Sequence, residues 1–124
     1  MSKTITFQGR KHKVFDVLMP WGTEHLFLTE EHYTHGSKLA VQAYCLDEDG
    51  DVEPYATLTV NLNGIDHEMQ DDKALAFVDT NNCGEWAIPF LAGNGLAEPA
   101  GYLGMSGHCT YPLYRWNTTA FYED

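Results

Sequence analysis

The sequence predicts an α+β fold, a mostly antiparallel β-sheet with one short helix packed on it. Three observations predict this class. Apolar and polar residues alternate along most of the chain, which is typical of strands. Turn-forming Gly, Pro, Asp and Asn residues separate these segments. One segment, residues 85–92, precedes the Gly-Asn-Gly pattern that ends helices. The chain has 124 residues without a repeat or a linker, so residues 1–124 are predicted to form a single domain.

Seven segments show the strand pattern. The first two are expected to pair as a hairpin around Gly9-Arg10, and Met19–Gly22 breaks the chain before the third. The predicted strands are Thr4–Phe7, Lys13–Leu18, His25–Thr29, Leu39–Leu46, Tyr55–Leu62, Ala74–Asp79 and His108–Tyr114.

The clearest predicted unit is an antiparallel hairpin of Leu39–Leu46 and Tyr55–Leu62 in the middle of the sheet. Leu39–Leu46 is apolar on both faces, as expected for a central strand, whereas Tyr55–Leu62 alternates. Asp49-Gly50 lies between them and is a strong hairpin signal.

One helix is predicted over Glu85–Ala92. Asn81 or Asn82 is expected to cap its start, and a left-handed residue in 93–95 to end it. Pro89 is tolerated only near the first turn of a helix, so this helix is expected to be short or irregular.

Charge is unevenly distributed along the chain. The 18 Asp and Glu residues and seven Lys and Arg residues give a net charge of −11. Four of the cations precede the first acid, so residues 14–124 hold 18 acids against three cations, a net charge of −15. Such a surface repels nucleic acids and anionic membranes and attracts basic proteins or metal cations. The four early cations are Lys3, Arg10, Lys11 and Lys13.

The compartment is predicted to be the cytoplasm. The first 13 residues lack the apolar segment of a signal peptide. The three cysteines are widely spaced and form no CxxC motif, which suits reduced thiols rather than a disulfide framework.

Two acidic blocks are the candidate partner-binding residues. In an extended segment, alternate residues project to one side about 6.6–6.8 Å apart. Phosphates of a duplex strand lie ~3.4 Å apart along the axis, so such a row places one charge per two base steps. Residues 55–62 would separate the blocks by roughly 25 Å. The alternative is that these acids only form turns and maintain solubility. The blocks are Asp47, Glu48, Asp49, Asp51 and Glu53, followed by Asp66, Glu68, Asp71 and Asp72.

Metal and thiol chemistry are alternatives with weaker patterns. The first block does not fit an EF-hand, because Gly50 is misplaced and Leu58 stands where the last acid is needed. Cys83 precedes the predicted helix, with Asp79 and His108 as possible partners, but a small buried cysteine is commoner. No catalytic residue, resident metal or cofactor is therefore predicted. Whether four distant residues converge on zinc stays open: His32, His35, His108 and Cys109.

Three stretches resemble a family of small bacterial proteins without an assigned activity, found among Gram-positive and gut bacteria and often near mobile elements. They are Ala56–Leu62, Ala76–Asn82 and Cys109–Tyr114, and the resemblance covers roughly residues 36–116. The resemblance implies in which organisms the protein occurs and does not imply an activity. Separately, the size and acidity resemble those of phage and plasmid anti-restriction and anti-CRISPR inhibitors that mimic DNA.

These observations predict a non-enzymatic anti-defence inhibitor that acts in the host bacterial cytoplasm. It would occupy the basic nucleic-acid-binding groove of a defence effector as a DNA mimic, without binding nucleic acid or membranes itself. Two alternatives remain open. One is an enzyme that depends on a metal or on Cys83, Cys109 and the histidines, and the other is a housekeeping interaction module whose acidity serves solubility. The sequence makes no prediction of the oligomeric state.

Overall fold

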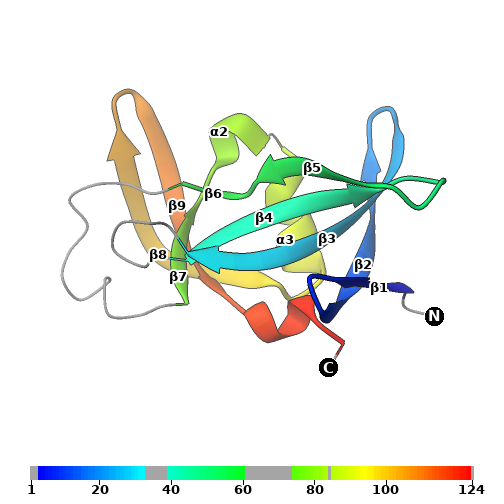
Figure 1. Cartoon of the computed structure of the whole chain (residues 1–124). Coiled ribbons are helices and arrows are strands. Elements are labelled where there is room, and N and C mark those ends of the chain that lie inside the picture. Colours follow the sequence, from blue (N-terminus) through cyan, green and yellow to red (C-terminus); the bar gives the residue numbers. More distant parts are fainter. Residues whose placement is uncertain (1–2, 33–38, 61–73, 84, 124) are drawn as a thin grey trace.

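The computed structural model describes residues 3–32, 39–60, 74–83 and 85–123. Their strands form two sheets in which every pairing is antiparallel, and Figure 1 shows both. The α+β class is confirmed, although the strands divide between two sheets rather than one. The five-stranded sheet follows chain order: β1 (Lys3–Phe7), β2 (Arg10–Met19), β3 (Gly22–His32), β4 (Leu39–Leu46) and β5 (Val52–Thr57). The four-stranded sheet has the order β6 (Thr59–Val60), β7 (Leu75–Val78), β9 (Cys109–Trp116) and β8 (Ala97–Ser106).

Two-residue turns connect the first three strands. Gln8 and Gly9 both have positive φ angles, 52° and 79°, as a type I′ turn requires, so the predicted first hairpin is confirmed. The expected break at Met19–Gly22 is a second tight turn, because Met19 pairs with Gly22 across it. Strands β2 and β3 are consequently longer than predicted, and they project as a hairpin with Trp21 at its tip.

The central hairpin is confirmed as a pairing but not in its position or extent. Strands β4 and β5 pair antiparallel, yet β5 is the outer strand of its sheet and ends at Thr57. Leu58 and Thr59 are both buried, which breaks the alternation and directs the chain into the second sheet. The backbone of Leu58 joins the sheets, since its N–H donates to the Val41 carbonyl at 2.8 Å and its carbonyl accepts from Asp79 N–H at 2.8 Å. Residues 61 and 62 lie outside the described residues.

Among the described residues, three short helical segments accompany the sheets: α2 (Thr80–Cys83), α3 (Ala87–Gly93) and the 3-10 helix η1 (Thr118–Phe121). The predicted helix is therefore confirmed as α3, with Pro89 in its first turn. Its predicted cap is wrong, because Asn81 and Asn82 belong to α2 and the N-cap of α3 is Trp86. The predicted end is confirmed, since Gly95 has a φ of 64° and the Leu96 N–H donates to the Leu91 carbonyl.

Strand β8 was not predicted. Its sequence, Ala-Glu-Pro-Ala-Gly-Tyr-Leu-Gly-Met-Ser, carries a proline and two glycines that obscure the strand pattern. The pairing with β9 shifts register between Pro99 and Leu103, where Gly101 adopts a φ of 81°. A bulged outer strand of this kind tolerates residues that a central strand excludes.

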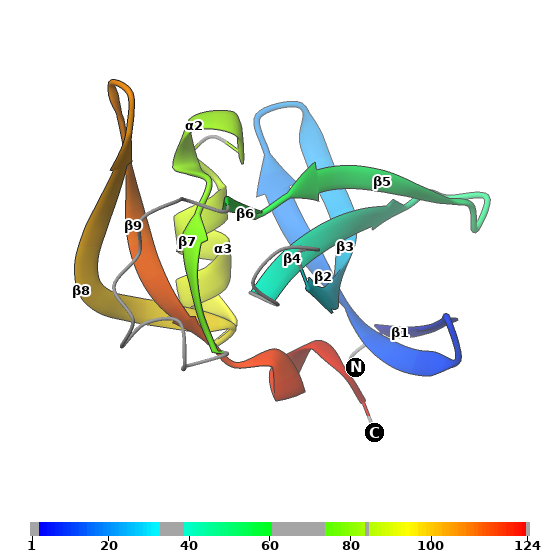
Figure 2. The same cartoon turned by 60° about the vertical axis from the view of Figure 1, so that its left-hand side comes forward.

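Both sheets contribute to one hydrophobic core. Figure 2 shows α3 between them, and its buried residues Ala87, Phe90 and Leu91 pack with residues of β2, β3, β4, β7 and β9. On the other face of the five-stranded sheet, the buried His12 contacts the rings of Phe27 and Tyr122. Within the described part of the chain, no helix is long and apolar enough to span a membrane.

Candidate partner-binding surface

Asp47, Glu48, Asp49 and Asp51 of the first acidic block lie in the tight turn between β4 and β5, and Glu53 follows on β5. Asp47 organises this turn, because its Oδ1 accepts hydrogen bonds from the backbone N–H groups of Asp49 at 2.9 Å and Asp51 at 2.8 Å. Gly50 has a φ of 87°, and its N–H donates to the Asp47 carbonyl at 3.1 Å. The Asp-Gly hairpin signal is thus confirmed, and the Asp47 carboxylate is engaged in holding the turn.

The acids of this block cluster instead of forming the expected row. Carboxylate oxygens of Asp47, Asp49 and Asp51 all lie within 4.8 Å of one another, because these residues follow a turn and not an extended strand. Only Glu53 lies on a strand, where it is exposed on β5, and Glu48 is exposed in the turn. The expected spacing of one charge per two base steps is therefore wrong for Asp47–Asp51.

The second block, Asp66, Glu68, Asp71 and Asp72, lies outside the described residues. The expected separation of the two blocks assumed one continuous strand over residues 55–62. That premise is wrong, because the chain leaves the first sheet after Thr57 and enters the second at Thr59.

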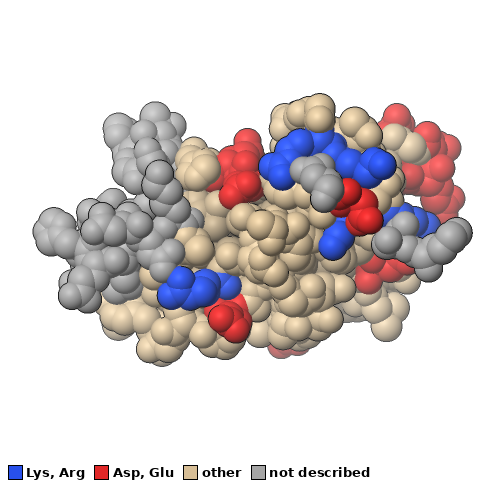
Figure 3. Space-filling model, turned by 90° about the horizontal axis from the view of Figure 1, so that it is seen from below, with Lys and Arg blue, Asp and Glu red and all other residues tan. Residues whose placement is uncertain are grey.

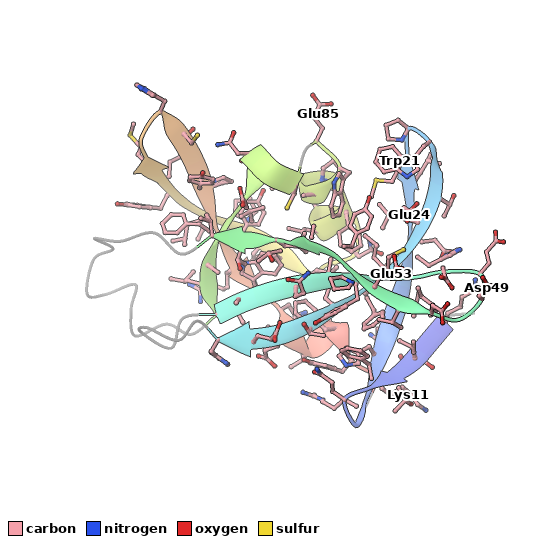
Figure 4. All side chains as sticks on the ribbon, turned by 45° about the horizontal axis from the view of Figure 1, so that its top comes forward. Lys11, Trp21, Glu24, Asp49, Glu53 and Glu85 are labelled. Carbon is pink, nitrogen blue, oxygen red and sulfur yellow. The ribbon has the colours of Figure 1, made fainter. Side chains whose placement is uncertain are left out.

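A half-buried carboxylate that sequence analysis missed lies beside this turn. Glu24 on β3 accepts hydrogen bonds from Trp21 Nε1 at 3.1 Å and from Cys45 Sγ at 3.1 Å. Cys45 lies directly opposite Glu53 in the β4–β5 register. In Figure 4, Glu24, Glu53 and Asp49 lie at the same end of the molecule as Lys11, above it, and Lys11 lies at the lower edge. Only the strand register brings residues 24, 45 and 53 together, so no local pattern indicated this arrangement.

Aromatic side chains border these acids. Trp21 is 67% exposed at the tip of the β2–β3 hairpin, although its indole N–H is held by Glu24. Tyr55 contacts Trp86 in an edge-to-face arrangement with ring centroids 5.8 Å apart. Burial, followed by the negative charge of Glu24, raises the pKa of the Tyr55 hydroxyl. We call Trp21, Glu24, Asp49, Asp51 and Glu53 the acidic–aromatic surface.

Cations gather elsewhere on the five-stranded sheet. Lys3, Arg10 and Lys11 are exposed on β1 and β2, and Arg10 lies over the Tyr122 ring, 3.4 Å from its centroid. Figure 3 shows Lys and Arg side chains gathered where Figure 1 places β1 and β2, with some acidic side chains beside them and a further acidic group at the margin that holds the β4–β5 turn. Residues 47–53, which form this turn and the start of β5, contain acids and no Lys or Arg.

A family model described as a domain of unknown function, DUF4313, matches residues 27–123. The chain belongs to the DUF4313 family. The predicted resemblance to a family of small proteins is confirmed at this level, over a longer stretch than residues 36–116. The DUF4313 match includes the β4–β5 turn and begins within β3, so β1, β2 and Trp21 precede it. No curated protein and no solved structure matches the chain significantly.

The cysteines of this DUF4313 chain are free thiols. Burial, a hydrogen bond to Glu24 and the charges of Glu24 and Glu53 raise the pKa of Cys45 to about 11. Burial and the charge of Asp79 raise the pKa of Cys83 to about 11, and its Sγ donates to the Thr57 carbonyl at 3.2 Å. Both thiols are protonated at neutral pH, which disfavours the hypothesis that Cys83 is a nucleophile.

The suggested zinc ligands do not converge among the described residues. His32 is exposed at the end of β3, whereas His108 is exposed in the turn between β8 and β9. In the part of the DUF4313 chain that the structure describes, only Asp47, Asp49 and Asp51 form a group of three potential metal ligands. All three side chains are exposed. His35 lies outside the described residues.

We expect Cys45 to react slowly with iodoacetamide at pH 8. A pKa of about 11 instead of 9.0 lowers the thiolate fraction, and so the rate, by roughly 100-fold. The rate should rise as the pH approaches 11, because the thiolate then forms. Glu24→Gln removes one source of negative charge, so it should accelerate alkylation of Cys45 several-fold and leave Cys83 unchanged. Site-resolved mass spectrometry measures both rates, with the urea-unfolded chain as reference. Equal rates for the folded and unfolded chain would contradict the raised pKa.

Proposed function

We propose that this DUF4313 protein is a non-enzymatic inhibitor that occupies the basic nucleic-acid-binding groove of another protein as a DNA mimic. A bacterial defence effector in the cytoplasm is the proposed partner, and a phage or mobile element the proposed source. The observation that carries this proposal is the acidic–aromatic surface. Its exposed acids lie in and directly after the β4–β5 turn, and Glu24 links the exposed Trp21 to Cys45, the residue opposite Glu53.

The acids of this surface suit recognition of cations. Among the described residues, no Lys or Arg forms an ion pair with Asp49, Asp51 or Glu53, so their charge is available to a partner. The protruding turn allows several carboxylates to enter a concave groove together, as a phosphate backbone does. A net charge of −11 also accelerates encounter with a basic protein at low salt.

Trp21 and Glu24 add a second kind of contact. Tryptophan is a common anchor at interfaces and attracts an Arg or Lys side chain to its ring face. Because Glu24 holds the Trp21 indole N–H, the ring is oriented before the partner binds. The same carboxylate lies next to the ring and is half-buried, where attraction to a guanidinium is stronger than in open water.

Charge reversal tests the proposal. The variant Asp49→Lys, Asp51→Lys, Glu53→Lys should lose at least about 100-fold in affinity, since close interfacial charge pairs contribute roughly 1.5 kcal/mol or more each. Asp47 is left intact because it holds the turn. The measurement is competition with labelled duplex DNA for candidate defence effectors. Raising the salt concentration from about 50 to 200 mM should weaken wild-type binding.

A matched control distinguishes the effect of where the charges lie from the effect of the net charge on affinity. Glu31→Lys, Glu98→Lys, Glu123→Lys makes the same change in charge at exposed positions outside the surface, and it should lose far less affinity. If both triple variants bind as the wild type does, the acidity serves solubility. Circular dichroism verifies that both variants are folded.

A further inference from the structure

The hairpin of β8 and β9 contrasts with the rest of the molecule in charge. Residues 99–114 contain no Asp, Glu, Lys or Arg, in a chain of which 20% is charged. A run of this length would ordinarily hold about three charged residues at that frequency. The hairpin therefore offers a neutral surface on a protein that is otherwise strongly acidic.

The same hairpin exposes large apolar side chains. Tyr102, Leu103 and Met105 on β8 are 46%, 65% and 70% exposed. In the described part of the chain, β8 is the outer strand of its sheet and pairs with β9 alone. Outer strands are usually guarded by charged side chains, which residues 102–106 lack. Figure 1 shows this hairpin at the end of the molecule opposite the β4–β5 turn.

The register shows which backbone groups of β8 face outward. Ser106 pairs with Cys109 across a two-residue turn, so this closing pair exchanges hydrogen bonds. Because bonded and non-bonded pairs alternate, Gly104 also bonds to its partner on β9, whereas Leu103 and Met105 do not. Leu103 lies opposite Pro112, which has no N–H to donate, in agreement with this assignment. The N–H and C=O groups of Leu103 and Met105 therefore point to the open edge.

We propose that a second copy of this chain binds this edge through an antiparallel β8–β8 pairing with its two-fold axis at Gly104. Leu103 of each copy then lies opposite Met105 of the other, and both pairs exchange backbone hydrogen bonds. The two four-stranded sheets become one continuous sheet. A second copy fits because the edge is self-complementary about Gly104, and because copies of net charge −11 approach each other most easily through an uncharged surface.

Sedimentation velocity of the wild-type chain tests the pairing from about 1 µM to 1 mM. The mass should rise with concentration from 14.0 kDa to twice that value. Raising the salt concentration should strengthen the dimer, because it screens the repulsion between the copies. Salt should instead weaken binding of the proposed basic partner. The salt series can therefore contradict the dimer without contradicting the proposed function. A wild-type chain that stays monomeric throughout would overturn the pairing.

Edge variants locate the interface. Leu103→Lys and Met105→Lys place like charges next to each other across the two-fold axis, so each should weaken dimerisation at least tenfold. Leu18→Lys is the matched control, because Leu18 is 82% exposed on β2, far from this edge in sequence and on the other sheet. Unchanged dimerisation of both edge variants, or loss of the dimer in the control alone, would refute the assignment. The salt series uses the unmodified chain and does not depend on the folding of any variant.

Discussion

Replacing Leu58 by alanine is expected to lower the free energy of unfolding by about 2–5 kcal/mol. The side chain is fully buried in the core that both sheets share. The backbone of Leu58 forms hydrogen bonds with Val41 on one side and with Asp79 on the other. The truncation therefore leaves a cavity at the point where the sheets meet, and surrounding structure relaxes only partly into such a cavity.

Urea unfolding followed by tryptophan fluorescence measures this loss. The midpoint should fall while the slope with urea concentration stays the same, because the surface exposed on unfolding hardly changes. Leu18→Ala is the matched control, since Leu18 is exposed, and it should change the stability by less than about 0.5 kcal/mol. Similar effects of the two substitutions would show that Leu58 is not buried as described.

His12→Ala is expected to cost about 3 kcal/mol of the free energy of unfolding. The imidazole is buried on the other face of the five-stranded sheet, with Nδ1 2.9 Å from the Leu28 carbonyl and Nε2 3.2 Å from the Phe7 carbonyl. Its ring also packs on Phe27 and Tyr122. Alanine therefore leaves a cavity and removes the ring donor of the buried hydrogen bond to the Leu28 carbonyl.

The same residue ties the C-terminal segment to the N-terminal hairpin. His12 forms a bridge with Tyr122, and the Glu123 N–H donates to the Lys11 carbonyl at 2.9 Å. We therefore expect His12→Ala to speed hydrogen exchange in residues 118–123 as well as to lower the urea midpoint. His32→Ala, at an exposed position of the same sheet, is the control. Unaltered exchange in that segment would argue against the coupling of the two termini.

Local pattern was sufficient for most of the elements. Alternation predicted most of the strands, because the two faces of a strand lie in different surroundings. Strand β4 was predicted instead from its apolar residues on both faces, as in a central strand. Turn chemistry predicted the hairpins, since Gly9 and Gly50 adopt the positive φ angles that their turns require. Strand β8 carries no such pattern, because Pro99 and Gly101 lie in a bulged outer strand.

The acidic–aromatic surface was only half predictable. Asp49, Asp51 and Glu53 stood out through charge, although the turn gathers the first two instead of spacing them along a row. No local pattern singled out Glu24 or Trp21. Their proximity to Cys45 and Glu53 arises from the pairing of neighbouring strands β2 to β5. A single sequence carries no record of such non-local pairs.

Composition and local pattern thus determined the α+β class, the strand-rich character, the main turns and the acidic charge of this chain. The tertiary structure alone decided that the strands form two sheets. That division depends on Leu58, whose burial beside Thr59 redirects the chain and whose backbone bonds reach both sheets. It also decided which acids lie together, because register is set by packing across strands and cannot be obtained from the order of residues within one strand.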